Sequence, residues 1–283
     1  MNSVSHIIRG TEFITSTPKH VLLYEAFGWE PPVFVHLAPV MGKNEDGSVS
    51  KLSKRHGATS FAELVDAGYL PEAIVNYVTL LGWSPRGELS EKEFFTMDEL
   101  IEAFELEGIS KSPSAFDIEK LNYFNSTYLK NLDPDVFSEL SMEWIVKAVD
   151  PDKVNAALIP ELLQSRLDRL SDIPAMLDFF SALPDYDREL FANKKNKLTV
   201  EDSMALLRKI KARFEAIDSW CYDTIHDVLY AVSEEEGAKI GKIMWPVRIA
   251  AAGKAVTPGG AIEICNILGK EETLRRFDIA LEK

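Results

Sequence analysis

One seven-residue segment combines most of the side chains that a polyphosphate would need. Residues 51–57, KLSKRHG, contain three cations, a hydroxyl, an imidazole and a glycine. Lys and Arg pair with phosphate oxygens, and Gly57 permits close approach of the backbone. A solvated basic loop has the same composition, so this alternative stays open. The usual nucleotide motifs, Walker A and GxGxxG, are not found in the sequence.

A second group of cations lies in the C-terminal half. Residues 193–197, NKKNK, precede apolar residues spaced by three and four, which predict a helix that begins near Thr199. Cations that project away from this apolar seam could contact nucleic-acid phosphates. The alternative is that the later cations only stabilise the C-terminal end of the helix. The candidates for phosphate contact are Lys194, Lys195, Lys197, Arg208 and Lys211.

The elements that would carry the first segment begin at the N-terminus. Residues 4–8 and 33–37 are β-branched or aromatic runs, and Pro18 opens a helical pattern that Gly28 closes. This order predicts a strand, a helix and a second strand parallel to the first. Two strands cannot bury both faces of a sheet, so we expect part of a larger domain.

From residue 57 onward the pattern is helical. Capping boxes at Ser60 and Thr96, with Glu three residues later in each case, predict helix starts, and Pro71 fits the first turn of another helix. We expect its buried face to consist of Ile74, Val75, Val78 and Leu81. Residues 131–134, NLDP, suggest a linker. The predicted fold class is mainly α with a small α/β portion.

Composition limits the classes of partner. The net charge is −14 and the pI is near 4.9, so any nucleic-acid contact must come from local basic patches. The apolar runs are shorter than a membrane span, and no leader is visible. Two distant cysteines indicate neither a zinc site nor a disulfide framework. We expect a cytoplasmic protein without a membrane partner.

Several longer motifs carry a resemblance to one family. KLSKR resembles the KMSKS signature of class I aminoacyl-tRNA synthetases, and the flanking sequence resembles glutamyl-tRNA synthetase. The similar segments are 6–13 (HIIRGTEF), 16–19 (STPK), 22–29 (LLYEAFGW), 51–60 (KLSKRHGATS), 68–73 (GYLPEA), 80–85 (LLGWSP), 110–113 (SKSP), 241–248 (GKIMWPVR) and 268–274 (LGKEETL). Together they extend over essentially the whole chain in the family's order.

One part of the family pattern is not found. Nothing in the sequence resembles the HIGH motif, which belongs with the first half of the family's catalytic domain. The resemblance therefore implies the C-terminal portion of such an enzyme. It implies the end of a Rossmann-type catalytic domain at 1–56, a helical stem-contact domain at 57–130 and an all-α anticodon-binding region at 131–283.

The resemblance also implies roles for particular residues. Lys51, Ser53, Lys54 and Arg55 would be catalytic, with Lys54 on the pyrophosphate of ATP, while Val40 and Met41 would line the adenine site. Arg9 and Glu12 would face glutamate. The alternatives are an ion pair between Arg9 and Glu12, a core role for Val40 and Met41, and solvated loop charges at Lys51 and Arg55.

The implied reaction joins glutamate to tRNA through a glutamyl-adenylate. ATP is a substrate, and magnesium is expected with it, although no carboxylate is identifiable as its ligand. The implied partners are glutamate, ATP, a glutamate-accepting tRNA and the missing N-terminal half of the catalytic domain, in a monomer. Trp220, Tyr222, Trp245 and Arg248 are weak candidates for anticodon contact, and Trp245 fits a core role better. A stand-alone tRNA-binding or regulatory module is the alternative function.

Overall fold

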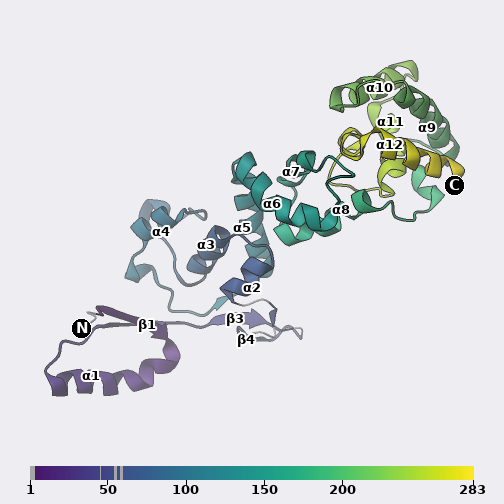
Figure 1. Cartoon of the computed structure of the whole chain (residues 1–283). Helices are drawn as coiled ribbons and strands as arrows, with labels where there is room; N and C mark the ends of the chain where they lie inside the picture. Colours follow the sequence, from purple (N-terminus) through teal and green to yellow (C-terminus); the bar gives the residue numbers. More distant parts are fainter. Residues whose placement is uncertain (1–3, 45, 54–55, 58–59) are drawn as a thin grey trace. The chain divides into compact units, whose positions relative to one another are not determined.

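The chain forms two compact units. The structure, a computed structural model, describes residues 4–44, 46–53, 56–57 and 60–283. The first unit is Met1–Tyr128 and the second is Leu129–Lys283, so the boundary falls inside helix α5 (Ile118–Asn131) (Figure 1). Strands occur in the first unit, and the described part of the second unit is helical. The predicted class, mainly α with a small α/β portion, is confirmed.

The N-terminal crossover has the predicted order and direction. Strand β1 (His6–Gly10) leads through a 3-10 turn into helix α1 (Thr17–Phe27) and strand β2 (Val33–Leu37). β1 and β2 pair in parallel, with His6 opposite Val33. Gly28 ends α1 in the left-handed region at φ 67°, where glycine is favoured because it has no Cβ.

This crossover has no buried side chain among residues 4–37. The side chains of Leu22, Phe27 and Trp29 are each more than half exposed. Those of Ile8 on β1 and Val33 on β2 are about half exposed. A parallel unit of this kind is normally covered on both faces. The crossover thus carries apolar surface that the described chain leaves open.

A second small sheet joins distant parts of the first unit. Strand β3 (Val40–Lys43) pairs antiparallel with β4 (Val49–Lys51) and parallel with β5 (Ser114–Ala115). Gly42 and Lys43, just before the KLSKR segment, belong to β3. The strands are two to four residues long, so their local hydrophobic pattern is weak.

Four more helices complete the described part of the first unit, the last of which continues past its boundary. They are α2 (Phe61–Asp66), α3 (Pro71–Gly82), α4 (Met97–Ala103) and α5. The capping boxes at Ser60 and Thr96 are both formed. Leu64, Tyr77 and Phe124 lie in one buried cluster from α2, α3 and α5.

The predicted buried face of α3 is partly wrong. Ile74 is buried, but Val78 is 47% exposed. The fully enclosed residues of this helix also include Asn76 and Tyr77. Val78 instead lines two open apolar cavities, so its side chain meets other apolar groups without being closed off from water.

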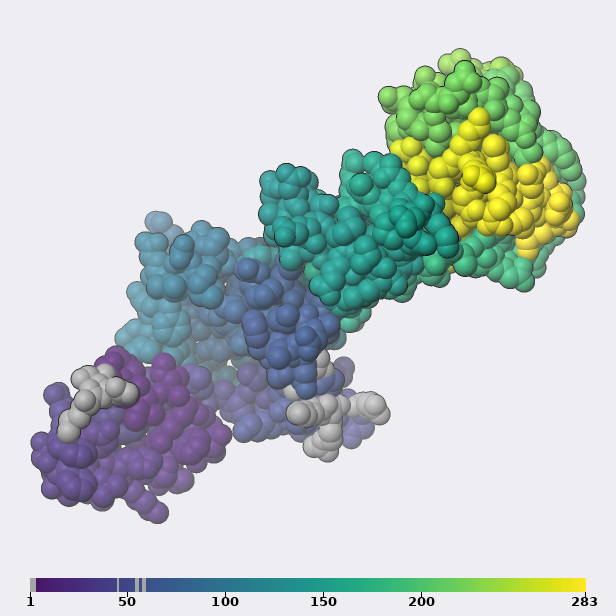
Figure 2. All heavy atoms as spheres, viewed as in Figure 1, coloured from purple at the N-terminus to yellow at the C-terminus, as the bar shows by residue number. Residues whose placement is uncertain are grey.

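The second unit contains seven further helices. They are α6 (Pro134–Ala148), α7 (Ile159–Leu163), α8 (Ile173–Ser181), α9 (Val200–Glu215), α10 (Tyr222–Glu235), α11 (Ile240–Ala252) and α12 (Ala261–Glu282). Further short 3-10 turns occur within each unit. Those of the first unit are Gly87–Leu89 and Leu106–Gly108, and those of the second are Ala156–Leu158, Leu170–Asp172 and Arg188–Phe191. Figure 2 shows the C-terminal helices, coloured green to yellow, as a closely packed body.

The predicted start and apolar seam of α9 are confirmed. Thr199 caps the helix and forms a capping box with Asp202. Met204, Leu207, Ile210 and Phe214 are buried on one side, as the spacing predicts, and Ile217 is buried just beyond the helix end.

A buried arginine joins three helices of this unit. Arg276 on α12 is 1% exposed and donates to the backbone oxygens of Phe179 on α8 and Ala251 on α11. Glu272, one turn earlier, accepts from the Arg276 Nε at 2.6 Å. These bonds satisfy a buried cation that would otherwise be strongly destabilising.

The helices of the described residues include none with the length and apolar character of a membrane span.

Candidate functional site

Arg9 lies on β1 and is held by the following turn and helix. Its terminal Nη2 donates to Thr17 Oγ1 at 2.9 Å and lies 3.3 Å from His20 Nδ1. The guanidinium also lies over the rings of Phe13 and Phe34, at 5.1 and 5.4 Å from their centroids. Its Nε is buried without a hydrogen-bond partner among the described residues. An oriented guanidinium fits a planar carboxylate.

Glu12 pairs with the start of the KLSKR segment. Its Oε1 lies 3.5 Å from Lys51 Nζ, and the described residues contain no ion pair between Glu12 and Arg9. A hydrogen bond from its own backbone N–H, and then the charge of Lys51, lower the pKa of the Glu12 carboxyl. The carboxylate folds over Gly10, so a side chain at position 10 would require the Glu12 carboxylate to move. Two predicted site segments, 39 positions apart, therefore meet at this pair.

The β3–β4 hairpin supports the KLSKR segment through His56. The His56 Nε2 lies 2.9 Å from Asn44 Oδ1, and its Nδ1 lies 3.0 Å from the backbone nitrogen of Ser53. The ring covers Gly42, where a Cβ would meet it at 2.7 Å. Lys51 is exposed at the end of β4 and Ser53 is half-buried. The predicted residues Lys54 and Arg55 lie outside the described residues.

Val40 and Met41 begin β3, beside apolar space. Val40 lines one cavity of about 310 Å³ with Trp83 and Phe104, and another of about 400 Å³ with Leu52 and Phe61. The backbone oxygen of Met41 accepts from Phe116 N–H at 2.8 Å. Both cavities belong to the first unit. Apolar walls beside exposed strand ends are suited to a flat organic ring.

Metal-ligating side chains do not gather into any group of three or more in the described part of the chain. No described residue is therefore assigned to the expected magnesium ion.

Three predicted lysines of the second unit lie in one compact turn. Asn193 and Leu198 pair through their backbones, and Asn196 Nδ2 donates to the backbone oxygen of Gly241 at 3.1 Å. Lys194, Lys195 and Lys197 are exposed. Within the described part of the chain these three have no carboxylate within 4 Å. Their charges are directed to solvent and are available to a polyanion.

Unlike the lysines of the 193–197 turn, two cations of α9 form ion pairs within the chain. Lys211 pairs with Glu215 at 2.6 Å and Asp278 at 3.0 Å, and hydrogen bonds to these two carboxylates raise the pKa of its ammonium. Arg213 pairs with Glu235. Arg208 is exposed, and no ion pair of it occurs among the described residues. Carboxylates of this chain thus neutralise Lys211 and Arg213, whereas the described residues leave Arg208 without such a partner.

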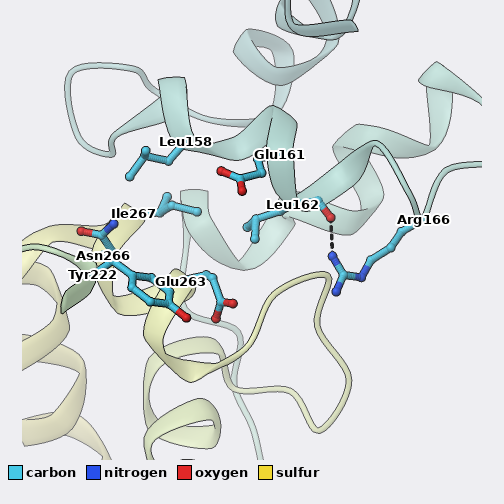
Figure 3. A pocket seen from close by; sticks show the side chains of 8 residues that line it. All are labelled: Leu158, Glu161, Leu162, Arg166, Tyr222, Glu263, Asn266 and Ile267. Atoms are coloured by element: carbon cyan, nitrogen blue, oxygen red, sulfur yellow. Dashed lines mark hydrogen bonds between the residues drawn. The ribbon is translucent and has the colours of Figure 1, made fainter. Parts of the chain in front are cut away.

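A cavity of about 430 Å³ opens among α7, α10 and α12 (Figure 3). Arg166 Nη1 donates to the backbone oxygen of Leu162 at 2.6 Å, while Tyr222, Glu263 and Asn266 come from the C-terminal helices. Burial, and then the charge of Glu263, raise the pKa of the Tyr222 hydroxyl. Arg166, Glu161, Glu263 and Asn266 were not candidates from the sequence. Glu161 lies on α7, Arg166 follows that helix, and Glu263 and Asn266 lie on α12, so the four residues form no single local motif.

The other weak candidates from the sequence divide into two kinds. Trp220 Nε1 donates to the Cys265 backbone oxygen and Trp245 Nε1 donates to that of Leu190, both at 3.0 Å. These hydrogen bonds indicate that both tryptophans stabilise the fold. Arg248 keeps a buried Nε without a partner among the described residues, and burial lowers the pKa of its guanidinium, while Glu263 of the cavity interacts with it.

Family comparisons assign both units. Residues 1–123 match the family described as tRNA synthetases class I (E and Q), catalytic domain, and residues 127–281 match the anticodon binding domain. The class defined by the fold and these matches is a class I aminoacyl-tRNA synthetase with an anticodon-binding domain.

Individual relatives narrow the class. The chain is 44% identical over 280 residues to a glutamate–tRNA ligase of Clostridium botulinum and 41% identical to one of Clostridium kluyveri, with 99% of this chain and 56% of each relative covered. A glutamate tRNA ligase of Elizabethkingia meningosepticum, solved in complex with its amino acid, aligns with a TM-score of 0.81 at 30% identity. That of Elizabethkingia anophelis aligns at 0.80 and 29%. Both structural alignments cover 99% of this chain and 57% of the other.

The chain belongs to the glutamyl-tRNA synthetase family. It spans about half the length of the curated relatives it matches.

Proposed function

We propose that this chain supplies part of the active site and the anticodon-binding region of a glutamate–tRNA ligase. The observation that carries the proposal is the contact between Glu12 and Lys51, 3.5 Å apart. It brings the exit of β1, where Arg9 lies, next to the cationic KLSKR segment. A carboxylate-binding arginine and a phosphate-binding segment on one edge are the two elements that adenylate formation needs.

The reaction is glutamate activation followed by transfer. The α-carboxylate of glutamate attacks the α-phosphorus of ATP, a carbon-linked oxygen bonds to phosphorus, and the bond to pyrophosphate breaks. Negative charge then grows on the leaving pyrophosphate, so cations that contact it stabilise the transition state. Lys54 takes this role in the proposal, with Lys51, Arg55 and the Ser53 hydroxyl in support. A ribose hydroxyl of tRNA then takes the glutamyl group and releases AMP.

Arg9 is the proposed reader of the glutamate side chain. The orientation that the hydrogen bond to Thr17 imposes on the guanidinium supports its contact with a carboxylate. Glu12 holds the substrate ammonium or orients Lys51. Val40 and Met41 are the proposed adenine contacts, and the apolar cavities beside Val40 support this assignment.

The proposal includes a covering segment for the N-terminal crossover. The exposed side chains of Leu22, Phe27 and Trp29 support the idea that the remaining catalytic portion of the family packs there. We therefore predict that the 283-residue chain alone does not activate glutamate. ATP–pyrophosphate exchange tests this, with Lys54→Ala as the contamination control. Exchange that Lys54→Ala abolishes would show that the isolated chain is active.

The tRNA part of the proposal is tested by titration. Glutamate tRNA and an anticodon-swapped version carry nearly the same phosphate charge, so non-specific affinities should match and fall together as salt rises. We expect tighter binding of the matched anticodon at both of two salt concentrations. Equal affinity by a chain whose thermal melt shows it folded would contradict anticodon recognition.

A stand-alone tRNA-binding module is the second candidate. The second unit favours it, because its core residues, such as Leu207, Ile243 and Phe277, are fully buried without another chain. One measurement distinguishes the two candidate functions. If the HIGH-bearing portion of the family, supplied as a separate chain, restores pyrophosphate exchange, the ligase function holds.

A further inference from the structure

His56 follows the KLSKR segment directly and has no role in the proposed reaction. Its ring lies against the β3–β4 hairpin at Gly42, where a Cβ would meet the ring carbons at 2.7 Å. Gly42 does not have a positive φ, so the close approach of the ring, rather than the backbone conformation, is the reason for a glycine at this position. The hairpin is thus shaped to receive the ring of His56.

The pleat of the hairpin separates His56 from the charge of Lys51. Gly42 lies opposite Ser50 in the strand register, one position before Lys51. Side chains alternate along a strand and directly opposite residues share a face, so Gly42 and Ser50 belong to the face that the ring covers. Lys51, which pairs with Glu12, belongs to the other face. His56 therefore supports the hairpin from the side opposite to this ion pair.

A chain of hydrogen bonds determines which ring nitrogen of His56 carries the proton. Hydrogen bonds from Ser48, that of its side chain first, lower the pKa of the Asp46 carboxyl, so this carboxylate only accepts. The Ser48 hydroxyl donates its single proton to Asp46 Oδ1 at 2.5 Å and must then accept from Asn44 Nδ2 at 2.8 Å. The amide oxygen of Asn44 consequently faces His56 Nε2 at 2.9 Å. Nε2 is therefore the nitrogen that carries the proton.

The other ring nitrogen, Nδ1, faces Ser53 of the KLSKR segment. In a neutral ring with its proton on Nε2, Nδ1 has a free lone pair. The Ser53 backbone N–H donates to it at 3.0 Å, and the Ser53 hydroxyl lies 3.3 Å away. The Ser53 carbonyl oxygen, also 3.0 Å from Nδ1, accepts from the backbone N–H of His56 at 2.9 Å. The opposite tautomer would donate to this oxygen, but it would turn the lone pair of Nε2 toward the Asn44 oxygen, which is repulsive.

We infer that His56 is a positioning residue of the ligase reaction, which as the neutral Nε2–H tautomer holds Ser53 against the β3–β4 hairpin. This inference rests on the proposed phosphate role of the KLSKR segment. The ring acts as a donor to Asn44 and as an acceptor from Ser53, so the two bonds select one orientation of the ring. A backbone that is already held loses less conformational entropy when the segment contacts phosphates.

The tautomer is tested first. Nitrogen-15 NMR of the 283-residue chain, labelled in its histidine rings, distinguishes the two tautomers at pH 8, where an ordinary histidine is neutral. The signals of His56 are those that His56→Asn removes. We expect the proton on Nε2. A proton on Nδ1, or a mixture of the two tautomers, would overturn the inference.

Two substitutions then separate the two bonds of the ring. The side-chain oxygen of Asn reaches about as far as Nδ1 and that of Gln about as far as Nε2, so His56→Asn keeps an acceptor for Ser53 and His56→Gln does not. Titration calorimetry with inorganic pyrophosphate measures binding by each variant. We expect His56→Gln to weaken binding about fivefold, the effect of one lost hydrogen bond, and His56→Asn to stay within about twofold of the parent. His6→Gln is the matched control, since His6 is exposed in the first unit and contacts its neighbour Ser5.

Gly42→Ala removes the space for the ring without changing its bonding groups. It should weaken pyrophosphate binding as much as His56→Gln, and the double variant should bind no more weakly than either, because both changes disrupt one contact. Thermal melts verify folding of each variant. If His56→Gln and Gly42→Ala bind like the parent while Lys54→Ala binds more weakly, the positioning role is wrong and the phosphate role of the segment stands. If Lys54→Ala binds like the parent, or the parent does not bind pyrophosphate, the proposed function of the segment fails and takes the inference with it.

Discussion

Lys197 combines a strained backbone with an exposed charge. Its φ of 51° makes it the one non-glycine residue with positive φ in the part of the chain that the structure describes. The turn is fixed around it, because Asn193 Oδ1 accepts from Asn196 N–H at 2.9 Å and Asn196 is tied to Gly241. A left-handed residue other than glycine costs about 1 kcal/mol. Persistence of this strain is consistent with use of the side chain.

Replacing Lys197 separates its two effects. We expect Lys197→Gly to stabilise the second unit by up to about 1 kcal/mol, since glycine adopts this φ freely. The same change should weaken tRNA binding and reduce the salt slope by about one, as loss of one phosphate contact requires. Urea unfolding and tRNA titration at several salt concentrations measure the two effects. Lys197→Gln is the control, because it removes the charge and keeps the strain.

Glu272 is the residue through which pH should act on the second unit. It accepts from Arg275 and Arg276, and these hydrogen bonds, that of Arg275 first, lower the pKa of its carboxyl. A lowered folded pKa contributes stability above the unfolded value, about 4.3. This contribution is lost as the pH falls through the folded pKa.

Glu272→Gln should therefore destabilise the chain by about 1 kcal/mol at pH 7, a value reduced for the partial exposure of the carboxylate. The gap to the parent should begin to narrow below the unfolded pKa, about 4.3, and should close as the pH falls through the lower pKa of the folded carboxyl. Urea unfolding at pH 7, 5 and 3.5 measures this. Glu271→Gln, one exposed position earlier, should have little effect at any pH. A gap that stays constant with pH would refute the role of the Glu272 charge.

At the scale of elements, the crossover and α9 represent opposite cases. On α1, Leu22 is 63% exposed, whereas Leu207 on α9 is fully buried. Leu22→Glu should change the unfolding free energy of the isolated chain by less than about 0.5 kcal/mol. Leu207→Ala should cost about 2–5 kcal/mol. Urea denaturation compares the two. A large cost for Leu22→Glu would show that the crossover is covered in the isolated chain, against the proposed covering segment.

The sequence predicted elements wherever the signal was local. Thr199, the apolar spacing after it, and Gly28 at the end of α1 each act within a few residues, and all are confirmed. The sheet of β3, β4 and β5 was missed, because β5 is two residues long and pairs with a strand some 70 positions earlier. Such pairing depends on the tertiary fold and leaves almost no trace in periodicity.

The same difference between local signals and long-range contacts applies to the residues of the candidate site. KLSKR was identifiable because its cations are adjacent. The partner of Glu12 was not, since Lys51 reaches it only after the chain has folded. Arg166 and Asn266 were missed for this reason also, as their cavity is built from three helices.

At the scale of the whole molecule, each unit has its own core. Phe124 belongs to the cluster of the first unit with Leu64 and Tyr77. Phe214 belongs to the second unit, where its ring lies 5.1 Å from that of Trp220 and 5.7 Å from that of Phe277. Both phenylalanines are fully buried. Separate cores allow separate unfolding transitions.

We therefore predict two transitions in urea, and each should respond to one substitution. Phe124→Ala and Phe214→Ala should each cost about 3–5 kcal/mol in their own unit. Distant sites without shared partners contribute independently, so each variant should shift one transition and leave the other near its parent midpoint. With the other tryptophans replaced by phenylalanine, the fluorescence of Trp83 reports unfolding of the first unit. That of Trp220 reports unfolding of the second unit. If either variant moves both probes equally, the chain unfolds as one cooperative body. The proposed anticodon binding by the second unit would then depend on the integrity of the first unit.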